Sequence, residues 1–174
     1  SEGDDANMSV LDIGGWTDLL ERFLPYHIVS INPDGSGHVI GDGCALPVVD
    51  NAVDAVVSID TLEHLPKEER LIFLSECLRV ARKWVIIAAP FGSAGHSANE
   101  RRLNELYFDT SGQIHAYLSE HVEFGLPGKG ELDYLEQNLS AKNVQRFYAG
   151  DYVWQGKCFE RMIVASRKPA ILKR

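Results

Sequence analysis

Several apolar runs of the chain end in small or polar residues that can hold a ligand. Carboxylate and amide oxygens accept hydrogen bonds from hydroxyl and amino groups. Glycines let the backbone approach a ligand closely, and a helix that begins beside them offers unpaired N–H groups. The residues concerned are Asp12, Gly14, Gly15, Asn32, Asp42, Gly43 and Asp60. Together they predict a site for a nucleotide-like ligand.

A group that accepts a proton during catalysis is expected among the six histidines. His64 follows the fourth apolar run, within Glu63-His64-Leu65-Pro66, and is the candidate base because imidazole titrates near neutral pH. The alternative is a structural corner in which His64 holds a backbone carbonyl. Further candidates, His96, His115 and His121, lie in a later segment. The histidines and acids show no metal-ligand spacing, so we expect no metal.

The elements that must position these residues alternate between strands and helices. Expected strands cover 10–13, 27–31, 38–40, 53–59 and 84–89, and expected helices cover 17–24, 66–83, 99–108, 115–122 and 131–139. A tight loop has to join the second strand to the third, because the stretch between them is too short for a helix. Two strands, 144–149 and 158–166, are expected to close the sheet as an antiparallel pair.

This alternation predicts an α/β fold with a doubly wound, mostly parallel, seven-stranded sheet and an antiparallel C-terminal strand pair. Ligands in such sheets bind over the carboxyl ends of the strands, where Asp12, Asn32, Asp42 and Asp60 fall. The length of 174 residues suits a single domain, 1–174, and 45% apolar residues suffice for a core.

Charge and composition narrow the class of protein. The net charge of −8 and the absence of a basic run argue against nucleic-acid binding. The three cysteines, Cys44, Cys77 and Cys158, show no CxxC pairing, which favours a reducing compartment. Residues 1–7 are unlike a signal peptide, and no apolar run reaches the roughly 18 residues of a membrane span. We therefore expect a cytoplasmic protein that does not bind membranes.

The middle of the chain carries an ordered series of motifs. They are Gly41-Asp42-Gly43-Cys44-Ala45-Leu46-Pro47, Asp50-Asn51, Val53-Asp54-Ala55-Val56-Val57-Ser58 and Leu62-Glu63-His64-Leu65-Pro66. In this series the chain resembles the class I S-adenosylmethionine-dependent methyltransferases, which have a Rossmann-like fold. The resemblance extends from Val10 to about Phe91, and beyond it only the general layout is similar. It implies a cofactor-binding half, 8–91, and a substrate-side segment with closing strands, 92–174.

The resemblance also implies a role for each polar residue. Asp12, Gly14 and Gly15 would lie under the methionine part of S-adenosylmethionine. Asn32 falls where the family has an acid that binds the ribose, and Asp42 and Gly43 fall where the adenine is bound. Asp60 would border the methionine and the substrate. The reaction implied is in-line methyl transfer to an unidentified acceptor, expected to be a small molecule.

The same residues also have alternative, purely structural roles. Asp12 can cap the following helix, Asp42 can form only a turn, and Asp60 can cap a helix or end a loop. Trp16 and Asp18 stand where the family has glycines. The Trp16 side chain either packs against the cofactor or occupies the place of the cofactor.

The departures at Trp16, Asp18 and Asn32 support an alternative, a non-catalytic binding or regulatory protein of the same fold. A nicotinamide-dependent dehydrogenase fits less well because the GxGxxG spacing is absent. The family's helical segment before the first strand is largely missing from the sequence. We therefore expect a second copy of the chain to cover the exposed sheet face, as a homodimer.

Overall fold

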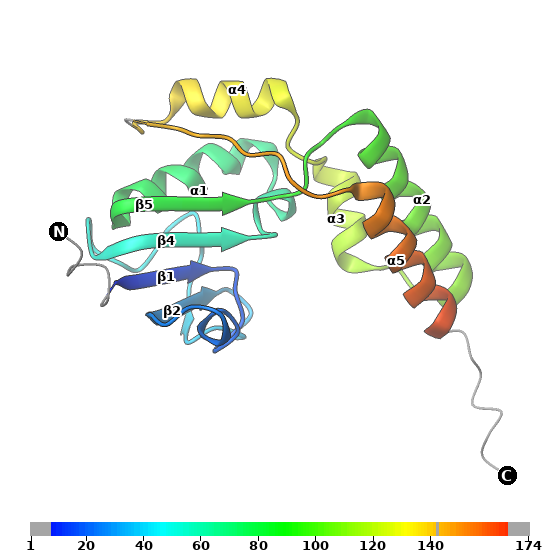
Figure 1. Cartoon of the computed structure of the whole chain (residues 1–174), viewed down its shortest axis with the longest axis horizontal. Helices are drawn as coiled ribbons and strands as arrows, with labels where there is room; N and C mark the ends of the chain where they lie inside the picture. The colour runs from blue at the N-terminus through cyan, green and yellow to red at the C-terminus, as the bar shows by residue number, and fades with distance from the viewer. Residues whose placement is uncertain (1–7, 142, 167–174) are drawn as a thin grey trace, which may run out of the picture.

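The computed structural model describes residues 8–141 and 143–166 (Figure 1). Residues 1–7, discussed above as unlike a signal peptide, lie outside the described residues. Within them, five parallel strands form one sheet in the order β3-β2-β1-β4-β5. The strands are β1 (Ser9–Ile13), β2 (His27–Asn32), β3 (Val39–Ile40), β4 (Val53–Ile59) and β5 (Ala81–Ala88).

The chain direction places a switch in strand order at the centre of the sheet. From β1 the chain moves outward to β2 and β3, and it then crosses to the other side of β1 for β4 and β5. β1 pairs with β2 from Ser9↔His27 to Ile13↔Ile31, and with β4 from Val10↔Ala55 to Asp12↔Val57. The carboxyl ends of β1 and β4 therefore meet at the switch, where ligands bind in doubly wound folds.

The connection from β2 to β3 is a loop with no helix, as expected from its length. The loop turns back along β2, where the His38 Nδ1 atom accepts the Ser30 N–H at 3.1 Å. Thr17 donates through both its N–H and its hydroxyl to the Ser36 carbonyl. These bonds join the turn after β1 to the loop after β2.

One face of the sheet carries the main core. α1 (Lys67–Val80) and α4 (Lys129–Asn138) cover it. Buried strand residues Leu11, Ile13, Ile31 and Val56 pack there with Phe73, Leu74, Cys77 and Val80 of α1 and Leu135 of α4. The expected helices 66–83 and 131–139 are thus present with slightly different ends. The near-continuous apolar run of β4 fits a strand that is covered on both faces.

The opposite face has a smaller core. Val10, Ile28, Ala55 and Val57 pack with the segment around η2 (Leu20–Arg22), a short 3-10 helix. An α-helix over 17–24 was expected, and that expectation was wrong. Pro25 ends the segment, and two turns are too short to hold an α-helix without more packing. On β5, the large side chains of Trp84 and Ile86 are exposed.

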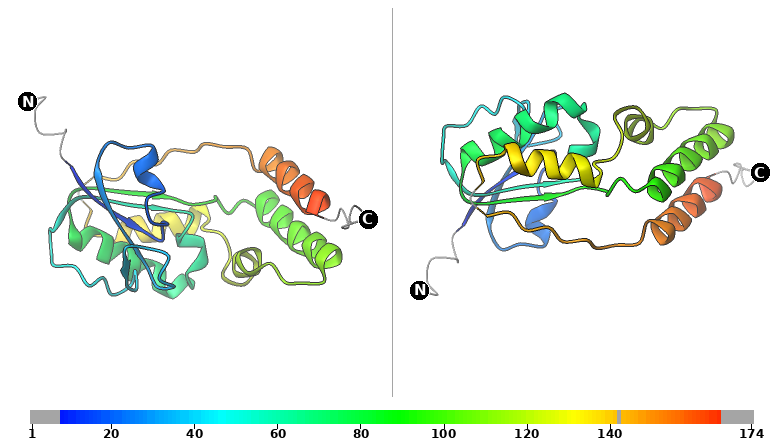
Figure 2. Two further views of the ribbon diagram at one scale, coloured as in Figure 1. Left: turned by 90° about the horizontal axis from the view of Figure 1, so that it is seen from below. Right: turned by 90° about the horizontal axis from the view of Figure 1, so that it is seen from above.

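Three helices form a separate layer beyond the carboxyl ends of the strands (Figures 1 and 2). They are α2 (Ala94–Ser111), α3 (Ala116–Phe124) and α5 (Tyr152–Ser166). α2 and α5 lie side by side, and their shared core contains Leu103, Leu118 and Ile163. The helix expected over 99–108 is the middle of α2, and the one expected over 115–122 overlaps α3 but begins one residue before it and ends two residues short of its end.

The antiparallel C-terminal strand pair is the main error of the sequence interpretation. Residues 144–149 form no strand, and 158–166 belong to α5. Phe159 and Ile163, four residues apart, pack on one side of α5 against the α2–α3 core. The β-branched pair Ile163-Val164 favoured a strand, but tertiary packing overrode that weak local preference. The sheet of the described residues therefore has five strands, all parallel, instead of seven.

Candidate functional site

The carboxylate of Asp12 is the buried acid at the carboxyl end of β1. The residue is 5% exposed, and no hydrogen bond to its carboxylate is present among the described residues. Burial raises the pKa of this carboxyl above its ordinary value. A Cβ atom added at Gly15 would lie 1.8 Å from Asp12 Oδ2, so a larger residue there would displace the Asp12 carboxylate. A buried acceptor without a protein donor suits a ligand that donates to it.

The turn after β1 depends on Gly14. Its φ of +85° favours glycine, and an added Cβ would lie 2.2 Å from Thr61 Oγ1. The Gly14 N–H donates to the Ile31 carbonyl at 2.9 Å, and Asn32 Nδ2 donates to the Gly14 carbonyl at 3.2 Å. Asn32 therefore holds the turn with its amide, and its Oδ1 atom is the acceptor left for a ligand hydroxyl.

Asp42 and Gly43 both have local roles. Asp42 is exposed, and its Oδ1 accepts the Cys44 N–H at 2.8 Å, which makes the turn that the sequence left open as an alternative. A Cβ at Gly43 would lie 2.6 Å from the ring of Phe73 on α1. Packing against Phe73 therefore accounts for the glycine at this position, independently of any ligand that its N–H binds.

Asp60 follows β4 in a left-handed backbone conformation with φ 52°. Its N–H donates to the Ala88 carbonyl at 2.9 Å, which joins the ends of β4 and β5, and its side chain is exposed. The next residue, Thr61, donates its hydroxyl to the Ile13 carbonyl at 3.2 Å. The ends of β1, β4 and β5 are therefore tied together around the turn.

Trp16 and Asp18, the two residues that replace glycines of the family, lie on the surface of this turn. Trp16 is 65% exposed. Asp18 has φ 61°, and its Oδ1 lies 3.3 Å from Nε2 of His38 in the loop after β2. The extra carboxylate thus pairs with a neighbouring loop.

A second group of polar residues lies between η3 (Leu62–His64) and the helical layer. His64 Nε2 faces His121 Nε2 of α3 at 3.3 Å. His64 Nδ1 lies 2.7 Å from Glu120 Oε2, and His121 Nδ1 lies 3.0 Å from Glu100 Oε2 of α2. The alternative in which His64 holds a backbone carbonyl is not what the structure has: its partner is the side chain of Glu120. Burial and then the charge of His121 lower the pKa of His64.

Glu63 is the most buried acid of this group, with 1% of its side chain exposed. Its Oε1 lies 4.0 Å from Nε2 of both His64 and His121, and its Oε2 has no hydrogen-bond partner among the described residues. Burial, with a smaller contribution from the charge of Asp60, raises the pKa of Glu63 to about 7. Such a shift is common at functional sites because it comes from a desolvated charge.

Glu100 connects the two histidines that face it. Its Oε1 lies 3.2 Å from His96 Nε2, while its Oε2 contacts His121. Burial opposes ionisation, but the hydrogen bond from His121 and the charges of His121 and His96 outweigh it and lower the pKa of Glu100. The carboxylate is therefore held in its charged form.

Arg70 fixes the corner that carries Glu63 and His64. This side chain is fully buried. It donates to the Leu65 carbonyl at 3.0 Å, to the Gly125 carbonyl at 2.6 Å and to Glu131 Oε1 at 2.6 Å. One guanidinium group thus joins α1, the end of η3, the end of α3 and α4. We refer to Glu63, His64, His96, Glu100, Glu120 and His121 as the histidine cluster.

Sequence reasoning found His64 but missed the acids of the cluster. Glu63 was part of a motif, and Glu100 and Glu120 fell within expected helices, 99–108 and 115–122, with no role of their own. A signal was present, since Glu63-His64 and Glu120-His121 are two Glu-His dipeptides, each followed within a few residues by Leu-Pro. Nothing in the spacing showed that the two dipeptides meet.

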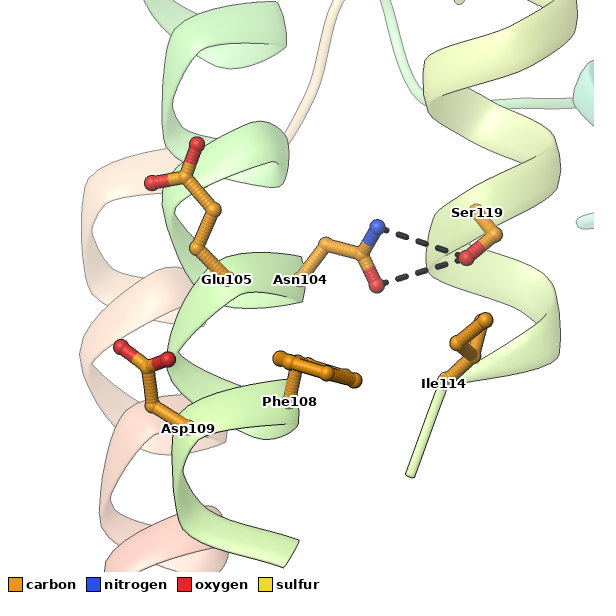
Figure 3. Close-up of a pocket in the computed structure, with 6 residues that line it drawn as sticks. All are labelled: Asn104, Glu105, Phe108, Asp109, Ile114 and Ser119. Atoms are coloured by element: carbon orange, nitrogen blue, oxygen red, sulfur yellow. Dashed lines mark hydrogen bonds between the residues drawn. The ribbon is translucent and has the colours of Figure 1, made fainter. Parts of the chain in front are cut away.

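A shallow pocket of about 330 Å³ lies elsewhere, between α2 and α3 (Figure 3). Its lining consists of Asn104, Glu105, Phe108, Asp109, Ile114 and Ser119. Asn104 Nδ2 donates to Ser119 Oγ at 3.3 Å across it. All six residues come from the helical layer, so this pocket is not a site over the carboxyl ends of the strands.

The fold agrees with comparisons to known proteins. Residues 17–88 match the family model of a methyltransferase domain. Among solved structures, a proposed sarcosine dimethylglycine methyltransferase from Galdieria sulphuraria is similar with a TM-score of 0.59 and 15% identity, over 95% of this chain and 66% of that one. The YcgJ protein from Bacillus subtilis has a TM-score of 0.52 and 16% identity, over 92% of this chain and 76% of that one. No curated protein matches the chain significantly.

Residues 17–88 thus match a methyltransferase domain, and the chain has the Rossmann-like α/β fold of the solved Galdieria sulphuraria structure. The resemblance seen in the sequence is confirmed at this level. The chain spans only 66% of the Galdieria sulphuraria protein. Among the described residues, no helix is both long and apolar enough to cross a bilayer.

Proposed function

We propose that this protein is an S-adenosylmethionine-dependent methyltransferase that transfers the methyl group in line to a small-molecule acceptor. The observation that carries the proposal is the buried Asp12 carboxylate without a protein partner, set beside Gly14 and Gly15 at the switch between β1 and β4. The cofactor is a zwitterion with an ammonium group and a sulfonium centre. A desolvated carboxylate beside a glycine turn is suited to that positive charge.

The other strand-end residues complete the proposed cofactor site. Asn32 Oδ1 would accept a ribose hydroxyl, with less strength than the carboxylate usual in the family. Asp42 would accept from the adenine amine with the oxygen that its turn does not use, and the Gly43 N–H would donate to the adenine ring. Asp60 would border the methionine part. These assignments rest on the family resemblance and on position at the carboxyl ends of the strands.

Methyl transfer from a sulfonium requires mainly that donor and acceptor be held in line. The acceptor would lie between the strand ends and the helical layer of α2, α3 and α5. His64 is the proposed proton acceptor, since its ring lies at the corner after β4 with its Nδ1 atom oriented by Glu120. A net charge of −8 fits a small acceptor better than a nucleic acid.

Calorimetric titration of the purified chain with S-adenosylmethionine and S-adenosylhomocysteine tests the proposal. We expect saturable binding of both, weakened at least tenfold by Asp12→Ala, with Asp109→Ala on the far end of α2 as control. No heat and no thermal shift with millimolar ligand would contradict the cofactor assignment. Acceptors can then be sought as compounds that gain one methyl group when the protein and cofactor are added to a cell extract.

The alternative is a non-catalytic protein of the same fold that binds or regulates a partner. Trp16, Asp18 and Asn32 favour it, because they replace residues that contact the cofactor in the family. Cofactor binding without any methylated product in extracts would support this alternative. The single-domain assignment, the cytoplasmic location and the homodimer stay predictions.

A further inference from the structure

We propose that Glu63, His64 and His121 bind a divalent transition-metal ion, with Zn²⁺ the ion best suited to their chemistry. One ligand atom from each of the three residues lies within 4.8 Å of the other two. Two imidazoles and one carboxylate form a common ligand set for zinc sites that keep one position open. This site is independent of the cofactor site, and its test does not require methyl transfer.

The spacing of the two imidazoles fits a shared ion. Their Nε2 atoms are 3.3 Å apart. Two nitrogens bound at about 2.0–2.1 Å to a tetrahedral Zn²⁺ ion lie roughly 3.4 Å from each other. Glu63 Oε1 is 4.0 Å from both nitrogens, so an approach of roughly half an ångström by one side chain would complete the set.

The hydrogen bonds on the far side of each ring also favour an ion. His64 Nδ1 contacts Glu120 and His121 Nδ1 contacts Glu100, and because a carboxylate accepts, these contacts assign the Nδ1 proton to both rings. When both rings are neutral, both Nε2 atoms present lone pairs, and these lone pairs face each other. Either a proton or a cation must lie between them. A carboxylate behind each metal-bound histidine is the usual arrangement around protein-bound metal ions.

Glu63 supplies an independent observation that points to a cation. Its side chain is 1% exposed, and its Oε2 atom has no hydrogen-bond partner among the described residues. An unpaired buried carboxylate is costly unless a cation or donor compensates it. The charges of Asp60, Glu100 and Glu120 surround the same corner and raise its affinity for a cation.

An ion at this position would join two layers of the molecule. Glu63 and His64 belong to the corner after β4, whereas His121 belongs to α3. In the occupied site His64 is a ligand and no longer the proton acceptor. A cation beside the acceptor would instead favour the deprotonated form of a hydroxyl group bound to it.

Zinc binding by the purified chain tests the proposal. After removal of metals with a chelator, the protein is titrated with Zn²⁺ against a chromophoric competitor, and the metal retained after dialysis is measured by mass spectrometry. We expect one equivalent per chain and a higher melting temperature with Zn²⁺. Substitution with Co²⁺ should give the visible absorption bands of a tetrahedral site.

Matched variants separate a metal site from other roles. His121→Ala and Glu63→Gln should each weaken Zn²⁺ binding at least 100-fold, and Glu120→Gln should weaken it about 10- to 100-fold, as for other residues that orient metal ligands. His27→Ala, an exposed histidine at the start of β2, should bind as wild type. Glu63→Gln is isosteric and removes a buried charge, so its loss of binding would not come from unfolding.

Two results would overturn the proposal: no saturable Zn²⁺ binding by the wild type at micromolar concentrations, or equal binding by wild type and His121→Ala. Either would assign the contact to a proton shared between two imidazoles. A failure here would leave S-adenosylmethionine binding unaffected, so the two proposals fail separately.

Discussion

His64 and His121 face each other through their Nε2 atoms at 3.3 Å, although 57 residues separate them in the chain. The contact joins the corner after β4 to α3, and each ring is oriented by a carboxylate on its other side. The cofactor half and the helical layer are therefore connected through titratable side chains as well as through apolar packing. This is the position where an acceptor would meet the proposed cofactor site.

Asp12→Asn should stabilise the unliganded protein while weakening its binding of S-adenosylmethionine. Burial raises the pKa of Asp12 in the folded state above its ordinary value of 3.8, so ionisation costs stability once the pH exceeds that value. The stability gain should be near zero at pH 3 and reach on the order of 1 kcal/mol at pH 7. Urea unfolding at several pH values measures it. A gain that is the same at all pH values would contradict this explanation.

Gly14→Ala should destabilise the fold by more than its backbone strain alone. A left-handed conformation costs a non-glycine residue about 1–2 kcal/mol, and the new Cβ would also press on Thr61 Oγ1. Gly112→Ala is the matched control, because Gly112 has φ +70° and no atom within 4 Å of an added Cβ. The excess loss in Gly14→Ala over Gly112→Ala, measured by urea unfolding, reports the close contact. Equal losses would mean that Thr61 moves away freely.

Arg70→Ala should cost about 3–5 kcal/mol of unfolding free energy, because it leaves Glu131 and two carbonyl groups without their buried donor. The control is Arg102→Ala, which removes an exposed ion pair with Glu160 and should cost about 0–1 kcal/mol. Thermal and chemical unfolding measure both. A cost below about 1 kcal/mol for Arg70→Ala would show that this corner repacks without the guanidinium group.

Trp16→Gly should leave the affinity for S-adenosylmethionine unchanged or lower it by up to roughly tenfold. A ring that is 65% exposed does not fill a packed cavity, so the structure favours a Trp16 that packs against the cofactor over one that occupies its place. Phe23→Gly, at an even more exposed aromatic residue near η2, controls for the loss of an aromatic surface side chain. Calorimetric titration decides between the two arrangements. A gain in affinity in Trp16→Gly would show that the ring occupies the place of the cofactor.

A homodimer is expected in solution, with the exposed sheet face as the interface. Ile59, Trp84 and Ile86 present large apolar side chains there, each about half exposed or more. Light scattering at several concentrations measures the oligomeric state, and Trp84→Glu should shift a dimer toward the monomer. A monomer at every concentration would contradict the expectation.

The parallel part of the fold was predictable because its signals are local. The apolar run of β4, the proline and acids at the start of α1 and the short loop before β3 are each local signals, and the expected strand 53–59 has the bounds of β4. The C-terminal strands failed because local preference there is weak. In that region the packing of Phe159 and Ile163 against α2 and α3 stabilises a helix.

The sequence by itself determined the chain order of β1 to β5 and the placing of Asp12, Gly14, Asn32 and Asp60 at the carboxyl ends of strands, since alternating strands and helices fold in few ways. Only the tertiary structure decided which of them are buried and what they contact. It also brought two Glu-His dipeptides together, because the position of α3 over the corner after β4 depends on the buried Arg70 and on packing between distant segments. Such contacts leave no periodicity or spacing in a single sequence.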